Sequence, residues 1–255
     1  MINRGDSFMK TLYDKSNLGF AIAWIAVYCI FMSVADAVSL NIGLEKSVTF
    51  FVGLLLSFTL LLFLKRHCLF TYYGLCRSGV SAKSMLYYLP ALILLTANTW
   101  HGISFNKSPF EIIFHILSML CVGFLEEVIF RGLLLNAMRK DNETAAVIVS
   151  SVTFGLGHII NLINGSGAEL FPNLMQIVYA TAAGFMFVMI YLKTKSLIGC
   201  IAIHGIFNAL SVFSDETNVT KEMQIIFCVL LTTITGAYAI YLAITMKKNE
   251  NTSVQ

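Results

Sequence analysis

The sequence predicts an all-α fold, a polytopic transmembrane helical bundle of about eight spanning helices with both termini in the cytoplasm. Hydrophobic residues make up 57% of the 255 residues, and the mean hydropathy is +0.78. Soluble domains are about 45–50% apolar and about 25% charged, whereas this chain is only 12% charged. The apolar residues also gather into stretches that approach or exceed the roughly 20 residues a spanning helix needs. We therefore expect residues 1–255 to form a single membrane domain.

Eight apolar stretches of spanning length follow one another along the chain. Lipid offers no hydrogen-bond partner to an open sheet edge, so each stretch is expected to be a helix. Ser108, Pro109 and Glu111 form a capping-box pattern that predicts the start of the fourth helix, and Pro172 predicts the start of the sixth. The predicted spans are Leu18–Leu40, Ser47–Leu64, Ser84–Trp100, Pro109–Met138, Thr144–Ile163, Asn173–Leu192, Leu197–Phe213 and Met223–Met246.

Basic residues are distributed unequally between the two sides of such a bundle. Cytoplasmic loops carry an excess of Lys and Arg, so the richer side, which includes both termini, is predicted to be cytoplasmic. The first 17 residues are polar, and no cleavable signal peptide is expected. One side carries Arg4, Lys10, Lys15, Lys65, Arg66, Arg77, Lys83, Arg139, Lys140, Lys193, Lys195, Lys247 and Lys248, and the other carries Lys46, Lys107 and Lys221.

The remaining composition narrows the function classes and the location. The net charge of +3 is too small to indicate a nucleic-acid partner. The six cysteines contain no CxxC pair, and we interpret them as reduced, small apolar residues rather than a disulfide framework or metal cage. We expect a multi-pass protein of a bacterial plasma membrane, with the lipid bilayer as its first partner.

The fourth predicted span contains three ionisable residues, Glu126, Glu127 and Arg131. A charge at the centre of a spanning helix costs about 2.5–3.5 kcal/mol, so such residues need partners and mark functional sites. Glu127 and Arg131 are four residues apart, share a helix face and are expected to pair. Glu126 points about 100° away, toward a second set of partners in the bundle interior.

Two other predicted spans carry polar residues of complementary types. The fifth contains Gly155 and Gly157 before His158, and we expect these glycines to let a neighbouring helix approach closely. The seventh contains His204 and Asn208, four residues apart and therefore on one face. At 1.5 Å per residue, Glu126, His158 and His204 lie about 20, 21 and 14 Å from the cytoplasmic ends of their helices. The three helices can therefore present these groups at similar depths.

This set of side chains is suited to hydrolysis. A carboxylate and an imidazole around one water form a general-base pair, and an Asn amide with a His N–H can stabilise an oxyanion. Arg131 offsets one negative charge and leaves the other glutamate to accept and return a proton. On the favoured interpretation no cofactor is required. A divalent metal such as zinc, held by at most two imidazoles and one carboxylate, is the alternative, although neither HExxH spacing nor a cysteine ligand is present.

Three motifs in these spans resemble a known family. The chain reads EExxxR at Glu126 to Arg131, FxxxH at Phe154 to His158 and HxxxN at His204 to Asn208. These motifs, in this order on three membrane helices, resemble the CAAX protease and bacteriocin-processing family of intramembrane proteases, also called CPBP or Abi. The resemblance covers residues 109–213, which we expect to be the catalytic core.

The resemblance implies a role for each motif residue. Glu126 is implied as the general base and His158 as the residue that holds the water. His204 and Asn208 would stabilise the oxyanion, with Glu127 and Arg131 supporting the site. Helical geometry alone allows either glutamate to be the base. The family is widely labelled metalloprotease, although a glutamate-type mechanism is also argued for it, and the spacing here favours the latter.

Two function hypotheses follow. The first is an intramembrane endopeptidase that acts on a membrane-associated peptide or protein, in bacteriocin self-immunity or peptide maturation. The alternative is a non-enzymatic membrane immunity or scaffold protein that binds a partner and keeps the motifs for packing. Outside the motifs, His115 is interpreted as a structural histidine, and no partner is identified for Asp36.

Overall fold

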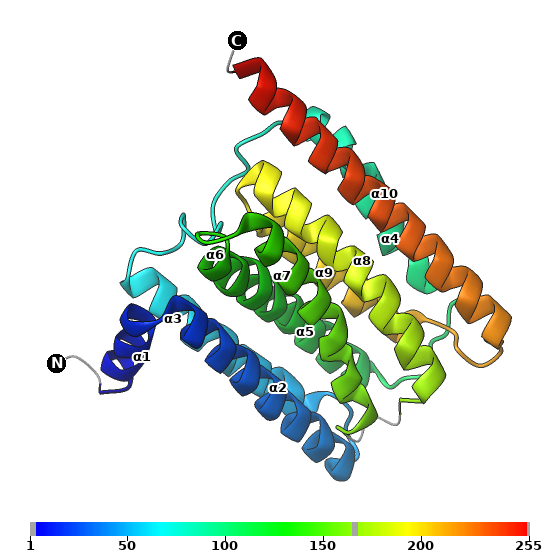
Figure 1. The fold of residues 1–255 in the computed structure, drawn as a ribbon. Coiled ribbons are helices and arrows are strands. Elements are labelled where there is room, and N and C mark those ends of the chain that lie inside the picture. The colour runs from blue at the N-terminus through cyan, green and yellow to red at the C-terminus, as the bar shows by residue number, and fades with distance from the viewer. Residues whose placement is uncertain (1–3, 165–167, 254–255) are drawn as a thin grey trace.

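The computed structural model describes residues 4–164 and 168–253, and these residues confirm the predicted helical membrane bundle (Figure 1). Six helices among them are long and apolar enough to cross a membrane. The described residues form no strand beyond one isolated β-bridge between Ile103 and Ser214. The α-helices are α1 (Arg4–Lys15), α2 (Asn17–Ile42), α3 (Ser47–Arg66), α4 (Leu89–Leu95), α5 (Pro109–Glu126), α6 (Leu135–Met138), α7 (Glu143–Gly157), α8 (Leu170–Thr194), α9 (Ile198–Leu210) and α10 (Lys221–Ser253). The other helical segments are η1 (Ala82–Tyr88), η2 (Ala97–Thr99), η3 (Glu127–Leu134), η4 (His158–Leu162) and η5 (Ser211–Phe213).

The prediction of one continuous helix over Ser84–Trp100, the third span, is wrong. The segment is divided among η1, α4 and η2, and its apolar helical part, Leu89–Thr99, is too short to count among the six long helices. Tyr88 has a left-handed backbone with φ of 56°, and Pro90 follows in the first turn of α4. A left-handed residue and a proline both interrupt regular α-helix. The seventh predicted span corresponds to Ile198–Phe213, which is also shorter than the six long helices.

Both ends of the described chain lie at the same end of the bundle. In Figure 1 the helices α2, α3, α8 and α10 run diagonally, and α2 begins and α3, α8 and α10 end at the left-hand ends of their diagonals. The last turns of α3 and α8 carry Lys65, Arg66 and Lys193 at this end. The basic residues therefore gather as the charge count predicted, while the cytoplasmic assignment of this end stays a prediction. Hydropathy did not predict the helix α1, whose Leu12 and Tyr13 pack half-buried against the core.

Asp36 has partners at the opposite end of the bundle. Its carboxylate lies 2.9 Å from Nζ of Lys46 and accepts a hydrogen bond of 2.6 Å from the Thr49 hydroxyl. The three residues link the end of α2 to the start of α3 and account for an acidic residue in an apolar helix.

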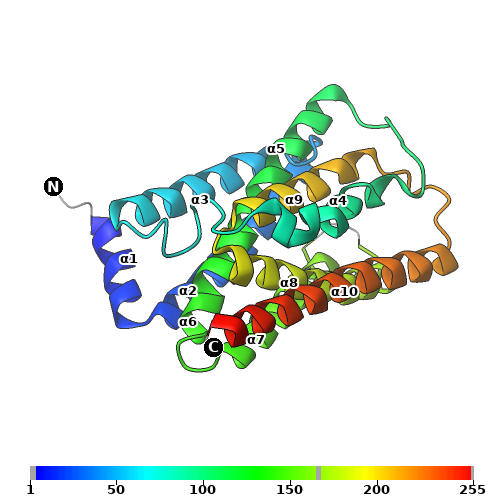
Figure 2. The ribbon, with the colours of Figure 1, turned by 90° about the horizontal axis from the view of Figure 1, so that it is seen from above.

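α5 is the central helix of the functional region and packs against α3 and α9 (Figure 2). It begins at the predicted capping box of Ser108 and Glu111. The contact with α9 is closest at Gly123, where an added Cβ would lie 2.6 Å from the backbone of Gly205. Two glycines thus allow backbone-to-backbone approach. Because His204 adjoins Gly205, this contact brings it to the glutamates at the end of α5.

The α-helical hydrogen-bond pattern changes at the glutamates. α5 continues into η3, which is an eight-residue π-helix, and then into α6. This change frees backbone carbonyls, which need polar partners inside a membrane. Ser150 donates to the carbonyl of Phe130 at 2.9 Å. The Asn136 amide donates to the carbonyls of Gly132 and Arg131 at 2.7 and 3.2 Å. Polar side chains therefore support the segment that carries Glu127 and Arg131.

The predicted close approach at the glycines of the fifth span is confirmed at one of the two. A Cβ at Gly155 would lie 2.0 Å from Oγ1 of Thr181, so α8 packs tightly there. At Gly157 an added Cβ would meet nothing within 4 Å, and the prediction is wrong at that position. Gly157 instead ends α7, and His158 opens the 3₁₀ segment η4. The change of helix type coincides with the histidine of the motif.

Candidate active site

Glu127 and Arg131 form a fully buried ion pair. Both side chains are 0% exposed, and Nη1 of Arg131 lies 3.2 Å from Oε1 of Glu127, which confirms the predicted pairing. The guanidinium also lies over the ring of Phe154, 4.0 Å from its centroid. A cation is attracted to the face of an aromatic ring, so α7 supplies a second stabilising contact. Glu127 therefore has a structural role in the interior of the site.

His204 lies between the two glutamates. Its Nδ1 is 2.8 Å from Oε1 of Glu127, and its Nε2 is 3.4 Å from Oε2 of Glu126. An ionised carboxylate can only accept, so Nδ1–H donates to Glu127. The ring of Phe187 stacks on the imidazole at a centroid distance of 5.5 Å and an interplanar angle of 19°. A hydrogen bond and a stacking contact together fix the direction of Nε2.

Glu126 occupies a different environment from its neighbour. Its side chain is 14% exposed. One carboxylate oxygen, Oε1, accepts a hydrogen bond of 2.6 Å from the hydroxyl of Tyr28 on α2. The other oxygen, Oε2, is the one near His204. Glu126 therefore has the second set of partners that the helical geometry predicted, and within the described part of the chain the ionic contact of its Oε2 is with the His204 imidazole.

The tautomer of His158 follows from its contacts with the end of α7. Its Nδ1 lies 3.2 Å from the carbonyl oxygens of both Phe154 and Gly155. A carbonyl only accepts, so Nδ1 carries the proton and Nε2 has a free lone pair. The amide of Asn173 donates to the backbone carbonyl of His158 at 2.9 Å, which ties η4 to α8. His158 is thus prepared to accept a hydrogen bond through Nε2.

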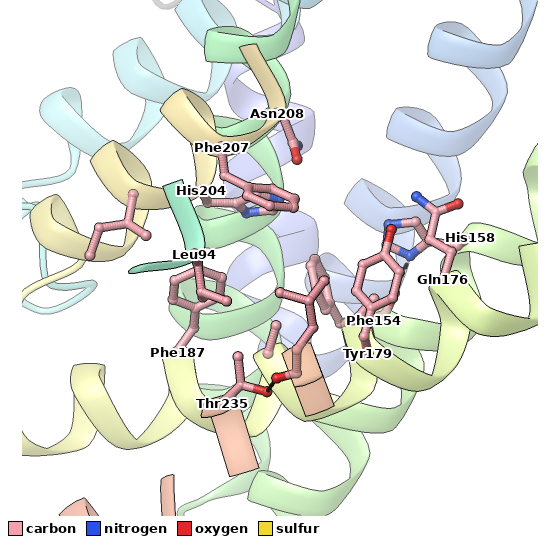
Figure 3. A pocket seen from close by; sticks show the side chains of 14 residues that line it. Leu94, Phe154, His158, Gln176, Tyr179, Phe187, His204, Phe207, Asn208 and Thr235 are labelled. Carbon is pink, nitrogen blue, oxygen red and sulfur yellow. Dashed lines mark hydrogen bonds between the residues drawn. The ribbon is translucent and has the colours of Figure 1, made fainter. Parts of the chain in front are cut away.

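His158, His204 and Asn208 line one pocket (Figure 3). The pocket is partly open, and its empty volume of about 540 Å³ includes space open to the outside. Figure 3 shows the two histidines on opposite sides of it, His204 from α9 and His158 from η4. Glu126 is not among the described residues that line the pocket, and it adjoins the pocket through His204. The other lining residues are mostly apolar or aromatic: Leu94, Phe154, Gln176, Tyr179, Ala180, Ala183, Phe187, Ile203, Phe207, Leu231 and Thr235.

Asn208 is anchored through its backbone. Its carbonyl oxygen accepts from the Ser211 hydroxyl at 2.7 Å and lies 3.4 Å from Nε2 of His115. His115 also lies 3.0 Å from that hydroxyl. These contacts agree with the interpretation of His115 as a structural histidine. They fix the end of α9 and leave the Asn208 amide to the pocket.

Glu126, Glu127, His158 and His204 are the candidate metal ligands of the site. Within residues 4–164 and 168–253, no group of three or more His, Cys, Asp or Glu side chains is placed to hold a metal ion. Glu127 already takes Arg131 and His204 on one oxygen. The geometry therefore does not fit a three-ligand metal centre, and we derive no chemical step through a metal.

The site contains two residues that the motifs did not identify, Tyr28 and Phe187. Tyr28 contacts Glu126 from a helix far away in the sequence. Tyrosines of membrane helices are usually enriched at the membrane surfaces, so its place near the middle of the first span was the available signal. Phe187 carried no comparable signal, because one phenylalanine among 20 in an apolar chain is unremarkable by sequence.

Comparison with known proteins agrees with the motifs. Residues 108–210 match the model of one family, described as type II CAAX prenyl endopeptidase, Rce1-like. The match confirms the predicted resemblance over this part of the chain and supports endopeptidase activity in the membrane. It contains the three motifs but excludes α1–α4 and α10. No curated protein and no solved structure matches the chain.

Proposed function

Since residues 108–210 match the Rce1-like endopeptidases, we propose that this chain hydrolyses peptide bonds of membrane-associated peptides or proteins with a water activated by Glu126. The observation that carries the proposal is the division of labour between the two glutamates. Glu127 is fully buried and paired with Arg131, whereas Glu126 is partly exposed and, among the residues that the structure describes, forms an ion-pair contact only with His204. A general base must be able to take and release a proton. Glu126 meets this requirement better than Glu127.

His158 is proposed to hold the water. Its Nδ1–H points to backbone carbonyls, which supports an accepting Nε2 on the pocket side. A water that donates one hydrogen to His158 and the other to Oε2 of Glu126 keeps its lone pairs for the carbonyl carbon. This arrangement raises the reactivity of the water without a charged nucleophile in the resting site.

Asn208 and His204 are proposed to stabilise the oxyanion. The Asn208 amide can donate to an oxygen in the pocket that both residues line. Donation from Nε2 of His204 requires that the ring carry both protons, because Nδ1–H is already given to Glu127. In that state the two glutamates, Arg131 and His204 carry two negative and two positive charges, so the buried site is balanced.

Glu126 both accepts and returns the proton that is transferred in the reaction. Glu126 takes a proton from water as the water oxygen bonds to the carbonyl carbon and the carbonyl oxygen becomes an oxyanion. When the carbon–nitrogen bond breaks, Glu126 returns that proton to the leaving nitrogen. The first products are a carboxylic acid and an amine, and Glu126 is ionised again; the acid then gives its remaining proton to the amine or to solvent water and leaves as a carboxylate. No cofactor is consumed, which suits the favoured glutamate-type mechanism.

The biological setting is proposed to be a bacterial plasma membrane. There the substrate would be an unprenylated peptide, in bacteriocin self-immunity or peptide maturation. The largely apolar lining of the pocket supports an apolar segment of such a substrate next to the scissile bond.

The test replaces Glu126 with Gln, which keeps its shape and removes the base. Purified wild type and variant are given two quenched fluorescent reporters, an apolar peptide and a farnesylated CAAX peptide. We expect kcat to fall about 10²–10⁴-fold. Glu143→Gln is the matched control, because Glu143 is an exposed glutamate paired with Arg139 away from the pocket, and it should keep full activity. Unchanged cleavage by Glu126→Gln refutes the mechanism, and no cleavage of either reporter by the wild type favours the non-enzymatic alternative.

A further inference from the structure

Tyr28 contacts the proposed base from outside the segment that resembles the protease family. It belongs to α2, whereas the family match begins at residue 108. Its hydroxyl donates to Oε1 of Glu126 at 2.6 Å, a normal length for an O–H···O hydrogen bond. Tyr28 lies about 17 Å along α2 from Asn17, close to the middle of a hydrocarbon core about 30 Å thick. This donor therefore reaches the carboxylate where little water is available to replace it.

The position of Tyr28 is fixed by the packing of α2. Trp24 and Met32, one turn before and one turn after Tyr28 on the same face, are both buried at 7% exposure. Met32 packs into the space above Gly53 of α3, where an added Cβ would lie 3.4 Å from its terminal methyl group. α2 also packs directly against η3, the segment that follows Glu126. The packing of α2 therefore fixes the backbone position of Tyr28 independently of its hydrogen bond to Glu126.

The two oxygens of Glu126 consequently have different surroundings. Oε1 is occupied by Tyr28, and Oε2 faces Nε2 of His204 at 3.4 Å. A glutamate has three side-chain torsions, and a free carboxylate would exchange its oxygens and turn among several rotamers. A donor that holds one oxygen leaves the other directed toward His204 and the pocket. Positioning of this kind lowers the barrier because the reactive geometry is prepared before the substrate binds.

We propose that Tyr28 is a positioning residue for hydrolysis, which holds Oε1 of Glu126 so that Oε2 is presented to the reacting water. This inference rests on the proposed function of Glu126. It adds α2 to the functional unit, so the segment that matches the family is not sufficient to orient its own base. The loss of a hydrogen bond to a charged group at such a site corresponds to about a tenfold to hundredfold loss of rate.

The test uses Tyr28→Phe, which keeps the ring and removes the hydroxyl. We expect kcat on the cleaved reporter to fall about tenfold to hundredfold, with KM changed less than about twofold because Tyr28 does not line the pocket. Tyr73→Phe is the matched control. It removes a buried hydroxyl that donates to Tyr13 at 3.0 Å in the same core, and it should leave kcat unchanged.

An infrared difference spectrum supplies a readout that does not depend on proteolysis. The carboxylate band of Glu126 is identified by subtracting Glu126→Gln from wild type, and Tyr28→Phe is expected to shift it while Tyr73→Phe does not. A shifted band with a reduced kcat supports the proposal. An unshifted band overturns it, even if kcat falls, since Tyr28 would then act only through folding. A shifted band with unchanged kcat also overturns it. If Glu126→Gln keeps full activity, the proposed function fails instead, whatever the spectra of the tyrosine variants show.

Discussion

Two adjacent glutamates occupy two contrasting regions of this molecule. Glu127 belongs to an inner cluster with Arg131 and Phe154, which is buried and held by an ion pair and a cation–ring contact. Glu126 belongs to an outer pair with Tyr28, which is partly exposed and neutral on the tyrosine side. One position along the helix, about 100° of rotation, separates a structural carboxylate from a candidate base.

The two carboxylates differ in function because their contacts differ. The carboxylate of Glu127 has an arginine and an imidazole on one oxygen, so that oxygen is occupied by structural contacts. The carboxylate of Glu126 has one oxygen bound to the phenol of Tyr28 and keeps its other oxygen for proton transfer. His204 contacts both regions, so it couples the inner cluster to the outer pair.

The largest effect on stability is expected from Arg131→Met, which breaks the inner cluster. It leaves Glu127 at 0% exposure without its guanidinium partner and with only the His204 contact, and removal of one partner of a buried pair costs about 3–5 kcal/mol. Thermal unfolding in detergent should show a large drop in Tm. The control is Arg139→Met in the exposed pair with Glu143, for which about 0–1 kcal/mol is expected. If the two variants lowered Tm equally, the buried ion pair would contribute no more to stability than the exposed one.

Asn208→Ala tests the part of the site that faces the pocket. The loss of one oxyanion donor costs about 10²–10³ in kcat, or about 2.7–4 kcal/mol of transition-state stabilisation, with little change in Tm. Steady-state kinetics on the cleaved reporter measure it. Ser211→Ala is the control, because it removes a hydroxyl bound to the Asn208 carbonyl and spares the amide. A fall of kcat in Ser211→Ala as large as in Asn208→Ala would assign the effect to the position of α9 and not to the donor.

Asn136→Leu should weaken the segment on which the inner cluster is built. The substitution leaves two carbonyls of η3 without their side-chain donor, and an unsatisfied buried group costs about 1–3 kcal/mol. Tm should fall, and kcat measured well below the new Tm should fall less. Thr59→Val is the control, since Thr59 is a half-buried helical residue whose hydroxyl donates to the carbonyl of Leu55 in its own helix, and a change within about 0.5 kcal/mol is expected. If Tm is unchanged in Asn136→Leu, the polar support of η3 is not needed.

The smallest effect is expected from chelation. Neither glutamate is part of a three-ligand set within the described residues, and the proposed mechanism uses no metal. Treatment with a zinc chelator should leave kcat unchanged, and metal analysis of the purified protein should find less than one equivalent. Loss of activity that zinc restores would instead establish the metal-assisted alternative and change the role of both regions.

The sequence predicted more of the membrane fold than of the site. Hydropathy located the six long helices because each contains a stretch of high mean hydropathy with few charged residues. It predicted Ser84–Trp100 as a continuous span because an average over residues does not register a left-handed backbone at Tyr88. Likewise, no propensity indicated the π-helix after Glu126, whose carbonyls accept from the side chains of Ser150 and Asn136.

Within the site, spacing predicted the pairs that lie on one helix and missed those that join different helices. The Glu127–Arg131 pair follows from four-residue spacing. The contact of His204 with both glutamates depends on the depth and rotation of α9 against α5, and the contact of Tyr28 depends on a helix with no motif. Such contacts are tertiary and have no periodic signature in the chain.

The glycine contact between α5 and α9 bears on how mutational surveys of this protein should be interpreted. Gly123 has no chemical group to contribute, yet a methyl group there would lie 2.6 Å from the Gly205 backbone and would force the two helices apart. A Gly123→Ala variant would therefore behave like the loss of a catalytic side chain, with His204 withdrawn from both carboxylates and every reactive group still in the chain. An alanine scan that ranks residues by loss of turnover would rank Gly123 together with Glu126. The first substitution would displace α9, and the second would remove the proposed base.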